Sequence, residues 1–360
     1  MMEKNKLRQI RKRCPACKRE FTGTLVICPT DDKLLIPIRE EMLEEMRWVL
    51  DFPCRKICRR CQGCFEAGDV CPTDGTELVA LVWTDKPIVD KKWTIIGVIG
   101  DGRLTRVFEI SGPNNERAVI KVLQAHLSGD RKTATRFITA LKDAASLDHI
   151  NIGKIIDGGL LGMRPYVTME FIDGCNLQSH LGVNGARPVS EAVPIFVGIC
   201  HGLSYAHKAG VMHNNLTMSN VYLTTQGTVK IVDFGLAERL FRGLEWDQQM
   251  THTASLYGNG LCLSPEYCKK GVTSERCDIY SVGCIMYETL SGHPVFEKDN
   301  GLMTLYAHMT EKAPPFNPQL KIPDWLAKVV LKCLEKDPDK RFQNADELSC
   351  ELSKGLGTKA

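Results

Sequence analysis

Residues 93–123 read WTIIGVIGDGRLTRVFEISGPNNERAVIKVL, and this stretch decides the fold of most of the chain. Alternating apolar and polar residues predict two β-strands on either side of a glycine-containing loop. The turn signal GPNN at residues 112–115 separates them from a third predicted strand, which carries Lys121. Glycines in the loop let backbone N–H groups approach a phosphate closely, whereas the β-branched Thr105 restricts that approach.

Three short motifs follow this stretch in a fixed order along the chain. Residues 212–220 read MHNNLTMSN, residues 233–235 read DFG and residues 264–266 read SPE. Together with the glycine loop and Lys121, they resemble the protein kinase family over residues 93–355. The resemblance implies an α+β, bilobal protein-kinase-like fold and, by analogy, serine/threonine specificity.

The resemblance also implies a nucleotide site that keeps most of the family's residues. Lys121 would hold phosphates of ATP, the segment after the gatekeeper Met169 would offer its backbone to adenine, and Asp233 would bind Mg²⁺. Val119 and Tyr222 replace smaller residues above and beneath the adenine, so they add bulk to the pocket. The implied cofactor-binding residues are Gly100, Gly102, Val107, Lys121, Met169, Glu170, Ile172, Asn220, Tyr222 and Asp233, of which Asn220 and Asp233 are the magnesium ligands.

The residues that would perform the chemical step are changed. Asn215 stands at the position of the catalytic aspartate, which accepts the proton of the substrate hydroxyl, and an amide cannot act as that base. Thr217 replaces the lysine that stabilises charge on the transferred phosphoryl group. Asn259 replaces a threonine that contacts both catalytic side chains in the family. Because these positions form one bonded network, their joint change predicts loss of the whole catalytic set.

The expected partner of Lys121 is missing as well. The helix predicted at residues 131–146 should supply a glutamate that orients this lysine, but no glutamate occurs from Lys121 to Thr168. Alignment places Ala140 at the expected position. Asp143 lies one helical turn later on a similar face and is the alternative partner, with a shorter reach.

Two segments near the start of the chain form an internal repeat. One reads CPAC at residues 14–17 and CPTD at residues 28–31; the other reads CRRC at residues 58–61 and CPTD at residues 71–74. A C-x2-C knuckle supplies two thiolates to a tetrahedral zinc site, and a CPTD turn can supply a thiolate and a carboxylate. The repeats resemble tandem zinc ribbons, with structural Zn²⁺ expected at Cys14, Cys17, Cys28 and Asp31 and at Cys58, Cys61, Cys71 and Asp74, where Cys54 and Cys64 are alternatives to Asp74. The duplication disfavours the other interpretation, that these are merely reduced structural cysteines.

These motifs divide the chain into five predicted parts. They are a first zinc-ribbon-like repeat with a basic arm at 1–36, a connecting helix at 37–53, a second repeat at 54–83, a linker at 84–92 and the kinase-like domain at 93–355. Within the last part, the resemblance implies that Asp278 begins a buried central helix and that Arg341 pairs with Glu266.

Composition and charge limit the partners and the compartment. A formal net charge of +3 gives the whole molecule no strong field for nucleic acid or membrane. Residues 1–20 hold eight Lys and Arg against two Glu, which favours a solvated tail over a nucleic-acid-binding arm. The chain has neither an apolar run of about 18 residues nor a signal-peptide core, so we expect no membrane span and a cytoplasmic location. Other proteins are the expected partners.

Three functions agree with these features. We favour a pseudokinase used in regulation or scaffolding. It rests on four changed positions, which affect the base, the lysine that stabilises the phosphoryl group and the partner that orients Lys121: Asn215, Thr217, Asn259 and Ala140. The second is an active serine/threonine kinase of low turnover, since Lys121, Asn220 and Asp233 are retained and phosphoryl transfer depends on positioning and electrostatics. The third is an adaptor whose zinc ribbons bind protein or nucleic acid.

Overall fold

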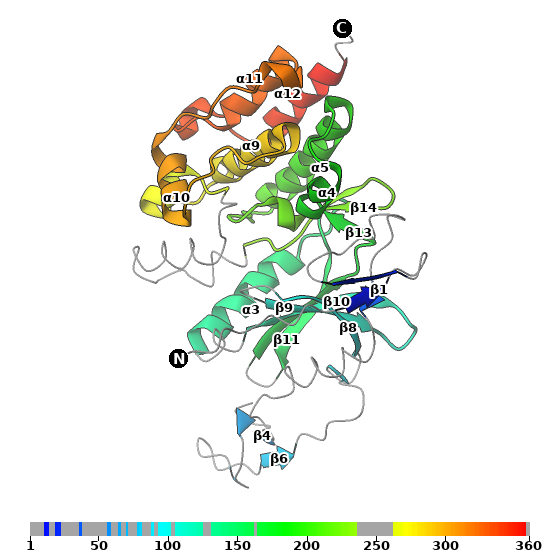
Figure 1. Ribbon diagram of the computed structural model, residues 1–360. Helices are drawn as coiled ribbons and strands as arrows, with labels where there is room; N and C mark the ends of the chain where they lie inside the picture. Colours follow the sequence, from blue (N-terminus) through cyan, green and yellow to red (C-terminus); the bar gives the residue numbers. More distant parts are fainter. Residues whose placement is uncertain are drawn as a thin grey trace, which may run out of the picture. The chain divides into compact units, whose positions relative to one another are not determined.

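The structure is a computed structural model that describes most of residues 93–357 and short stretches before them (Figure 1). The described residues are 11–13, 19–22, 36–37, 56–58, 64–65, 70, 78–80, 88–89, 93–101, 105–124, 131–161, 164–235 and 262–357. They fall into two compact units. The N-terminal unit comprises Met1–Ala134 and Ile156–Phe171, and the C-terminal unit comprises Thr135–Ile155 and Ile172–Ala360.

Two small three-stranded sheets come first in the N-terminal unit. In each sheet the first strand in sequence lies in the centre and pairs antiparallel with the other two. The strands are β1 (Arg11–Arg13), β2 (Glu20–Thr22) and β3 (Ile36–Pro37) in one sheet, and β4 (Lys56–Cys58), β5 (Cys64–Phe65) and β6 (Leu78–Ala80) in the other.

The two small sheets share one register relative to the sequence repeat. The equivalent pairs are Lys12–Phe21 and Lys56–Phe65 on one side of the central strand, and Arg13–Ile36 and Ile57–Val79 on the other. In both sheets the phenylalanine pairs with a lysine that lies two residues before the first cysteine of its repeat. The sequence duplication is therefore also a duplication of strand pairing.

A larger antiparallel sheet forms the body of the N-terminal unit, with strand order β11-β12-β10-β9-β8-β7. Its strands are β7 (Ile88–Val89), β8 (Trp93–Asp101), β9 (Thr105–Ser111), β10 (Arg117–Leu123), β11 (Ile155–Leu161) and β12 (Arg164–Glu170). One face buries an apolar cluster built from Trp93, Phe108 and Ile120 with their neighbours. The three strands predicted from residues 93–123 are present.

The hairpin of β9 and β10 sets which residues face each side of this sheet. Its turn is closed by a 2.9 Å hydrogen bond from Gly112 N to Glu116 O, and Asn115 has a left-handed φ of 59°, which asparagine tolerates. Side chains alternate along β10, so every second residue enters the apolar cluster. Val119 and Lys121 face the opposite side, where they are only half-buried.

Helices make up most of the C-terminal unit. The α-helices are α3 (Arg131–Ala145), most of which belongs to this unit, α4 (Leu177–Asn184), α5 (Val189–Lys208), α8 (Pro265–Lys270), α9 (Glu275–Ser291), α10 (Gly301–Thr310), α11 (Asp324–Cys333) and α12 (Ala345–Gly357). The short 3-10 helices are η1 (Met218–Asn220), η2 (Pro318–Leu320) and η3 (Pro338–Lys340). A small sheet of β13 (Gly174–Asn176), β14 (Val221–Thr224) and β15 (Val229–Ile231) completes the unit.

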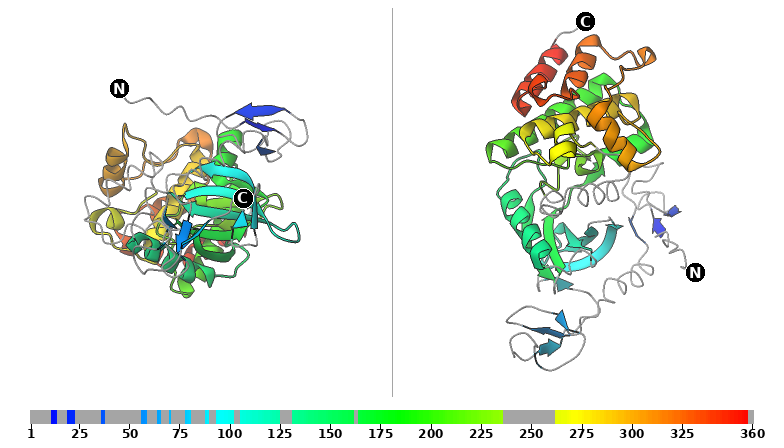
Figure 2. Two further views of the ribbon diagram at one scale, coloured as in Figure 1. Left: turned by 90° about the horizontal axis from the view of Figure 1, so that it is seen from below. Right: turned by 90° about the vertical axis from the view of Figure 1, so that its left-hand side faces the viewer.

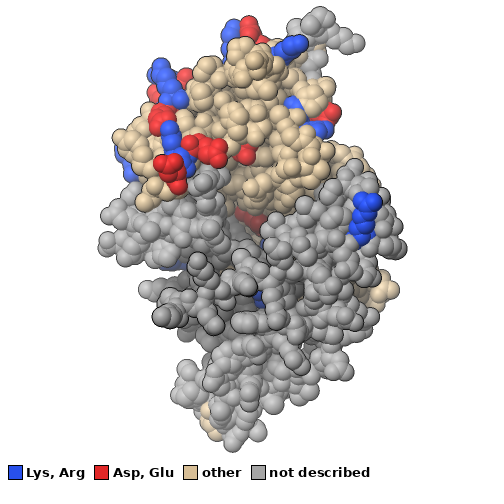
Figure 3. Space-filling model, viewed as in Figure 1, with Lys and Arg blue, Asp and Glu red and all other residues tan. Residues whose placement is uncertain are grey.

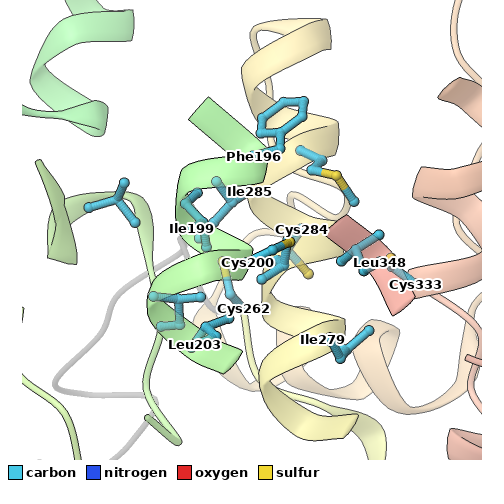
Figure 4. Close-up of a cluster of buried hydrophobic side chains, with 14 of the residues drawn as sticks. Phe196, Ile199, Cys200, Leu203, Cys262, Ile279, Cys284, Ile285, Cys333 and Leu348 are labelled. Atoms are coloured by element: carbon cyan, nitrogen blue, oxygen red, sulfur yellow. The ribbon is translucent and has the colours of Figure 1, made fainter. Parts of the chain in front are cut away.

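Helix α9 is the centre of this unit. It packs against α5 and α11, and α12 packs against α5 in the same group of helices (Figure 2). Thirteen of its 17 residues are buried, which confirms the predicted buried central helix; it begins at Glu275, three residues before the predicted start at Asp278. The core of the C-terminal unit contains cysteines as well as aliphatic side chains (Figure 4), and burial raises the pKa of the Cys200 and Cys333 thiols. These cysteines act as small apolar packing residues.

Helix α5 is the one described helix that is long and apolar enough, by length and composition alone, to cross a membrane. The core of the C-terminal unit explains its apolar character, because 56% of the apolar window is buried there. The described surface is mixed in charge: Figure 3 shows Lys and Arg next to Asp and Glu on the C-terminal unit. Because both signs of charge are mixed on the described part of this face, it does not favour a partner that is strongly acidic or strongly basic.

A buried ion pair connects α8 with the segment before α12. Arg341, whose side chain is fully buried, donates from Nη1 to Glu266 Oε1 at 2.7 Å and from Nη2 to Glu266 Oε2 at 2.8 Å. Burial alone would raise the pKa of the Glu266 carboxyl, but the hydrogen bonds and charge of Arg341 outweigh it, so this pKa is lowered. The pair predicted from the sequence is confirmed.

We expect Glu266→Gln to lower the free energy of unfolding by about 3 kcal/mol at pH 7, because Arg341 would stay buried without its counter-charge. A lowered pKa means that the wild-type contribution is present above the unfolded-state pKa and is lost as pH falls through the folded-state pKa. Urea unfolding should therefore show the difference between the two proteins closing below pH 4.5. The exposed Glu351→Gln is the control, with a change under about 0.5 kcal/mol. Equal stability of wild type and Glu266→Gln at pH 7 would contradict this account.

Candidate catalytic and nucleotide site

A buried carboxylate on α9 holds the segment at residues 213–220. Asp278 accepts hydrogen bonds from the backbone N–H groups of His213 and Asn214, each at 2.8 Å, and His207 Nε2 lies 2.8 Å from the same carboxylate. Burial alone would raise the pKa of Asp278, but the hydrogen bond from His207 and the nearby histidines outweigh it and lower this pKa. Asp278 is therefore ionised, and it fixes the start of the segment.

His213 fixes the same segment through its ring. Nε2 lies 2.9 Å from Val232 O, and Nδ1 accepts the N–H of Asn215 at 3.3 Å. Because a carbonyl can only accept, Nε2 carries the proton, and burial lowers the pKa of His213 so that the ring is neutral. The ring also lies 4.7 Å from that of Phe234, centroid to centroid. His213 thus ties the segment to the DFG motif.

The two implied magnesium ligands lie on segments that are bonded to each other within the C-terminal unit. Val232 N donates to Asn220 O at 2.9 Å, and Gly235 N donates to His213 O at 3.1 Å. Between these two bonds lies Asp233, whose φ of 68° is left-handed. Carboxylate and amide oxygens are ligands that Mg²⁺ accepts, so the donor set fits this cation.

Asn215 lies in an ordered loop. Its carbonyl accepts from Asn220 Nδ2 at 3.0 Å and its N–H is bonded to the ring of His213, so its backbone is held on both sides. The hydroxyl of Thr217 lies 2.8 Å from Ser219 Oγ and therefore bonds within the loop. An amide and a hydroxyl can hydrogen-bond a substrate, but neither is a base nor a cation at neutral pH.

Asn214 is a changed residue that was not predicted from the sequence. It has a φ of 60°, and its Oδ1 is buried with no hydrogen-bond partner among the described residues. The signal was present in the sequence, because the family motif H-R-D has an arginine at this position. With Asn215 and Thr217, it makes three neutral residues where the motif has an arginine, an aspartate and a lysine. The loop has lost every one of these charges.

Strand pairing gathers the predicted residues of the N-terminal unit on one side of its sheet. Lys121 lies opposite Val107 and Val167, Gly100 pairs with Val107, and Val119 lies opposite Met169. Gly102 lies outside the described residues. In α3, Ala140 is buried, so a methyl group occupies the helix position where the resemblance expects a glutamate.

The remaining residues predicted to bind the nucleotide are divided between the units. Glu170 ends β12 in the N-terminal unit, whereas Ile172 belongs to the C-terminal unit together with Asn220 and Asp233. Tyr222 lies on β14, half-buried, opposite Asn176 on one side and Lys230 on the other.

The predicted zinc ligands lie almost entirely outside the described residues. Cys58 ends β4 and the alternative ligand Cys64 begins β5. Among the described residues, no group of three or more His, Cys, Asp or Glu side chains could hold a metal ion. The zinc sites and Asn259 stay predictions.

Comparison with known proteins identifies the family of this chain. Residues 93–351 match the family described as the protein kinase domain. The serine/threonine-protein kinase PknB of Mycobacterium leprae is 32% identical over 275 residues, which are 75% of this chain and 44% of PknB. PknB of Mycolicibacterium smegmatis is 32% identical over 261 residues, 71% of this chain and 41% of its own length. The chain thus spans less than half of these relatives.

A solved structure is also similar in fold. A single-substitution mutant of the PknI kinase domain of Mycobacterium tuberculosis superposes with a TM-score of 0.60 at 20% identity, over 77% of this chain and all of that chain. At this identity the likeness concerns the fold alone. It agrees with the bilobal, mixed helix-and-sheet architecture predicted from the motifs.

Proposed function

Because this chain belongs to the protein kinase family, we propose that its kinase domain is a pseudokinase, which keeps the fold and the Mg–ATP residues without the base for phosphoryl transfer. One observation carries the proposal: Asn215 occupies the base position in a loop that Asp278 and Asn220 hold in an ordered shape. The defect is therefore chemical, because the loop around the changed residue is intact.

The size of the expected defect supports this choice. Removing a positioned general acid or base commonly costs about 10²–10⁴ in rate. Thr217 adds the loss of the cation that, in the family, stabilises charge developing on the transferred phosphoryl group. The chain keeps Lys121, Asn220 and Asp233, so the proposal includes binding of Mg–ATP and a role in regulation or scaffolding.

The decisive experiment is a radiolabelled ATP transfer assay with a general protein substrate and with the chain itself. We expect wild type to transfer no more label than Asp233→Ala, which removes the main magnesium ligand. Asn215→Asp combined with Thr217→Lys should raise transfer at least about 100-fold, because it returns a base and a cation to an ordered loop.

Thermal unfolding of each variant serves as the folding control for this assay. Wild-type turnover that Asp233→Ala abolishes would overturn the pseudokinase proposal and favour the serine/threonine kinase of low turnover. An inactive double variant with native stability would place the defect outside residues 215–217.

Nucleotide binding can be tested separately from transfer. We expect Mg–ATP at about 100 times its Kd to raise the Tm by about 5–10 °C, with a smaller rise in EDTA. Lys121→Met should remove most of the shift, and Tyr222→Leu should enlarge it by relieving bulk next to the adenine. Lys354→Met, on the exposed side of α12, is the matched control. No shift for wild type, and none for Tyr222→Leu, would remove ATP from the proposal.

We also propose that the N-terminal repeats are structural zinc ribbons that bind other proteins, with the cytoplasm as the compartment. The equal registers of the two small sheets support two equivalent sites. Elemental analysis of the full chain should find about two zinc ions, and Cys14→Ser and Cys58→Ser should each remove one. Ser353→Ala, at an exposed position of α12 outside both repeats, serves as the neutral control. Zinc-free protein of native stability would contradict the proposal.

A further inference from the structure

Three side chains of the N-terminal unit form a stack at the end of β12. Arg117 Nε donates to Glu109 Oε1 at 2.7 Å, and the Arg117 guanidinium carbon lies 3.6 Å from the ring centroid of Phe171. A guanidinium this close to an aromatic face makes a cation–π contact as well as van der Waals contact. We call Glu109, Arg117 and Phe171 the hinge stack.

The strand register explains why these residues meet. Arg117 pairs with Ser111 and Val119 pairs with Glu109, so Arg117 and Glu109 are diagonal neighbours across β9 and β10. By alternation, Arg117 shares the face of Val119 and Lys121, which is opposite to the apolar cluster. The stack thus lies on the side of the sheet that carries the nucleotide residues.

Phe171 is the residue between Glu170 and Ile172, whose backbone groups are expected to read adenine. A ring held against Arg117 limits rotation of the Phe171 side chain and, through it, of the adjoining peptide groups. Glu109 completes this restraint, because a charge-assisted hydrogen bond to Nε fixes the plane of the guanidinium. The restraint therefore extends from β9, through β10, to the segment after β12.

The exposure of the stack argues that its effect is local. The side chain of Arg117 is 47% exposed, and partly exposed ion pairs contribute little to global stability. Neither Arg117 nor Glu109 belongs to the apolar cluster of the sheet. Their removal should therefore leave the fold intact and change the order of residues 170–171.

We propose that Glu109 and Arg117 are positioning residues that hold the Phe171 segment in the geometry that reads the edge of an adenine base. The inference rests on the proposed binding of Mg–ATP and adds its base specificity. Adenine offers a 6-amino donor and an N1 acceptor, whereas hypoxanthine reverses both, so a positioned backbone distinguishes ATP from inosine triphosphate.

The first test measures the Kd of Mg–ATP and Mg–inosine triphosphate by calorimetry. Arg117→Ala should weaken ATP binding about threefold to tenfold while leaving inosine triphosphate nearly unchanged, since only adenine has the donor and acceptor that match the positioned backbone groups. Glu109→Gln should show a smaller change in the same direction, and Arg117→Lys should recover part of the loss. Glu116→Gln, an exposed neighbour outside the stack, should match wild type. An equal loss for both nucleotides would overturn the proposal.

The second test does not need a nucleotide. Hydrogen–deuterium exchange of the peptide that contains residues 166–173 should be faster in Arg117→Ala than in wild type or Glu116→Gln, at unchanged Tm. Unchanged exchange would overturn the hinge stack even if ATP binds. If wild type binds neither nucleotide, the ATP proposal fails, and the exchange result alone decides whether the stack orders the segment.

Discussion

The bonds of the Asp278 carboxylate are the constraint on which the loop of residues 213–220 depends. One buried group receives two backbone N–H groups and the ring of His207, from a helix that is itself almost wholly buried. A carboxylate removed from water is costly unless hydrogen bonds replace its hydration. The C-terminal unit is therefore most stable when α5, α9 and the loop are all in place, because only then are all the hydrogen bonds of Asp278 made. These bonds hold the loop in one conformation.

That constraint acts on backbone groups, which separates the shape of the loop from its chemistry. The N–H of Asn214 bonds to Asp278 and the carbonyl of Asn215 bonds to Asn220, whatever side chains these positions carry. A loss of charge at Asn214, Asn215 and Thr217 therefore leaves an ordered but neutral loop. The same segment remains bonded to Val232 and Gly235, on either side of Asp233, so the proposed Mg²⁺ ligands Asn220 and Asp233 lie on connected segments.

Parts of the fold and the site could be predicted from the sequence because motif order and alternation are local signals. The strand that carries Lys121 followed from alternation, whereas the buried α9 and the pair of Glu266 and Arg341 followed from the family resemblance that the motif order indicates; all three are confirmed. The bonds of His207 to Asp278 join residues 71 positions apart, and no local pattern indicates them. The contacts of Arg117 were missed for a related reason. A partly exposed arginine is common in a strand, and only the strand register shows that Glu109 and Phe171 lie beside it.

The sequence by itself determined the family, the internal repeat and the neutral residues of the catalytic loop, because these depend on residue identity at fixed spacing. Only the tertiary structure decided that the loop around Asn215 is ordered, since this depends on a buried carboxylate brought from a distant helix. It also decided that Glu109, Arg117 and Phe171 form one stack, because two strand pairings and a choice of rotamer must coincide before their atoms meet. Residue identity fixes which chemistry is available, and packing fixes where each group stands.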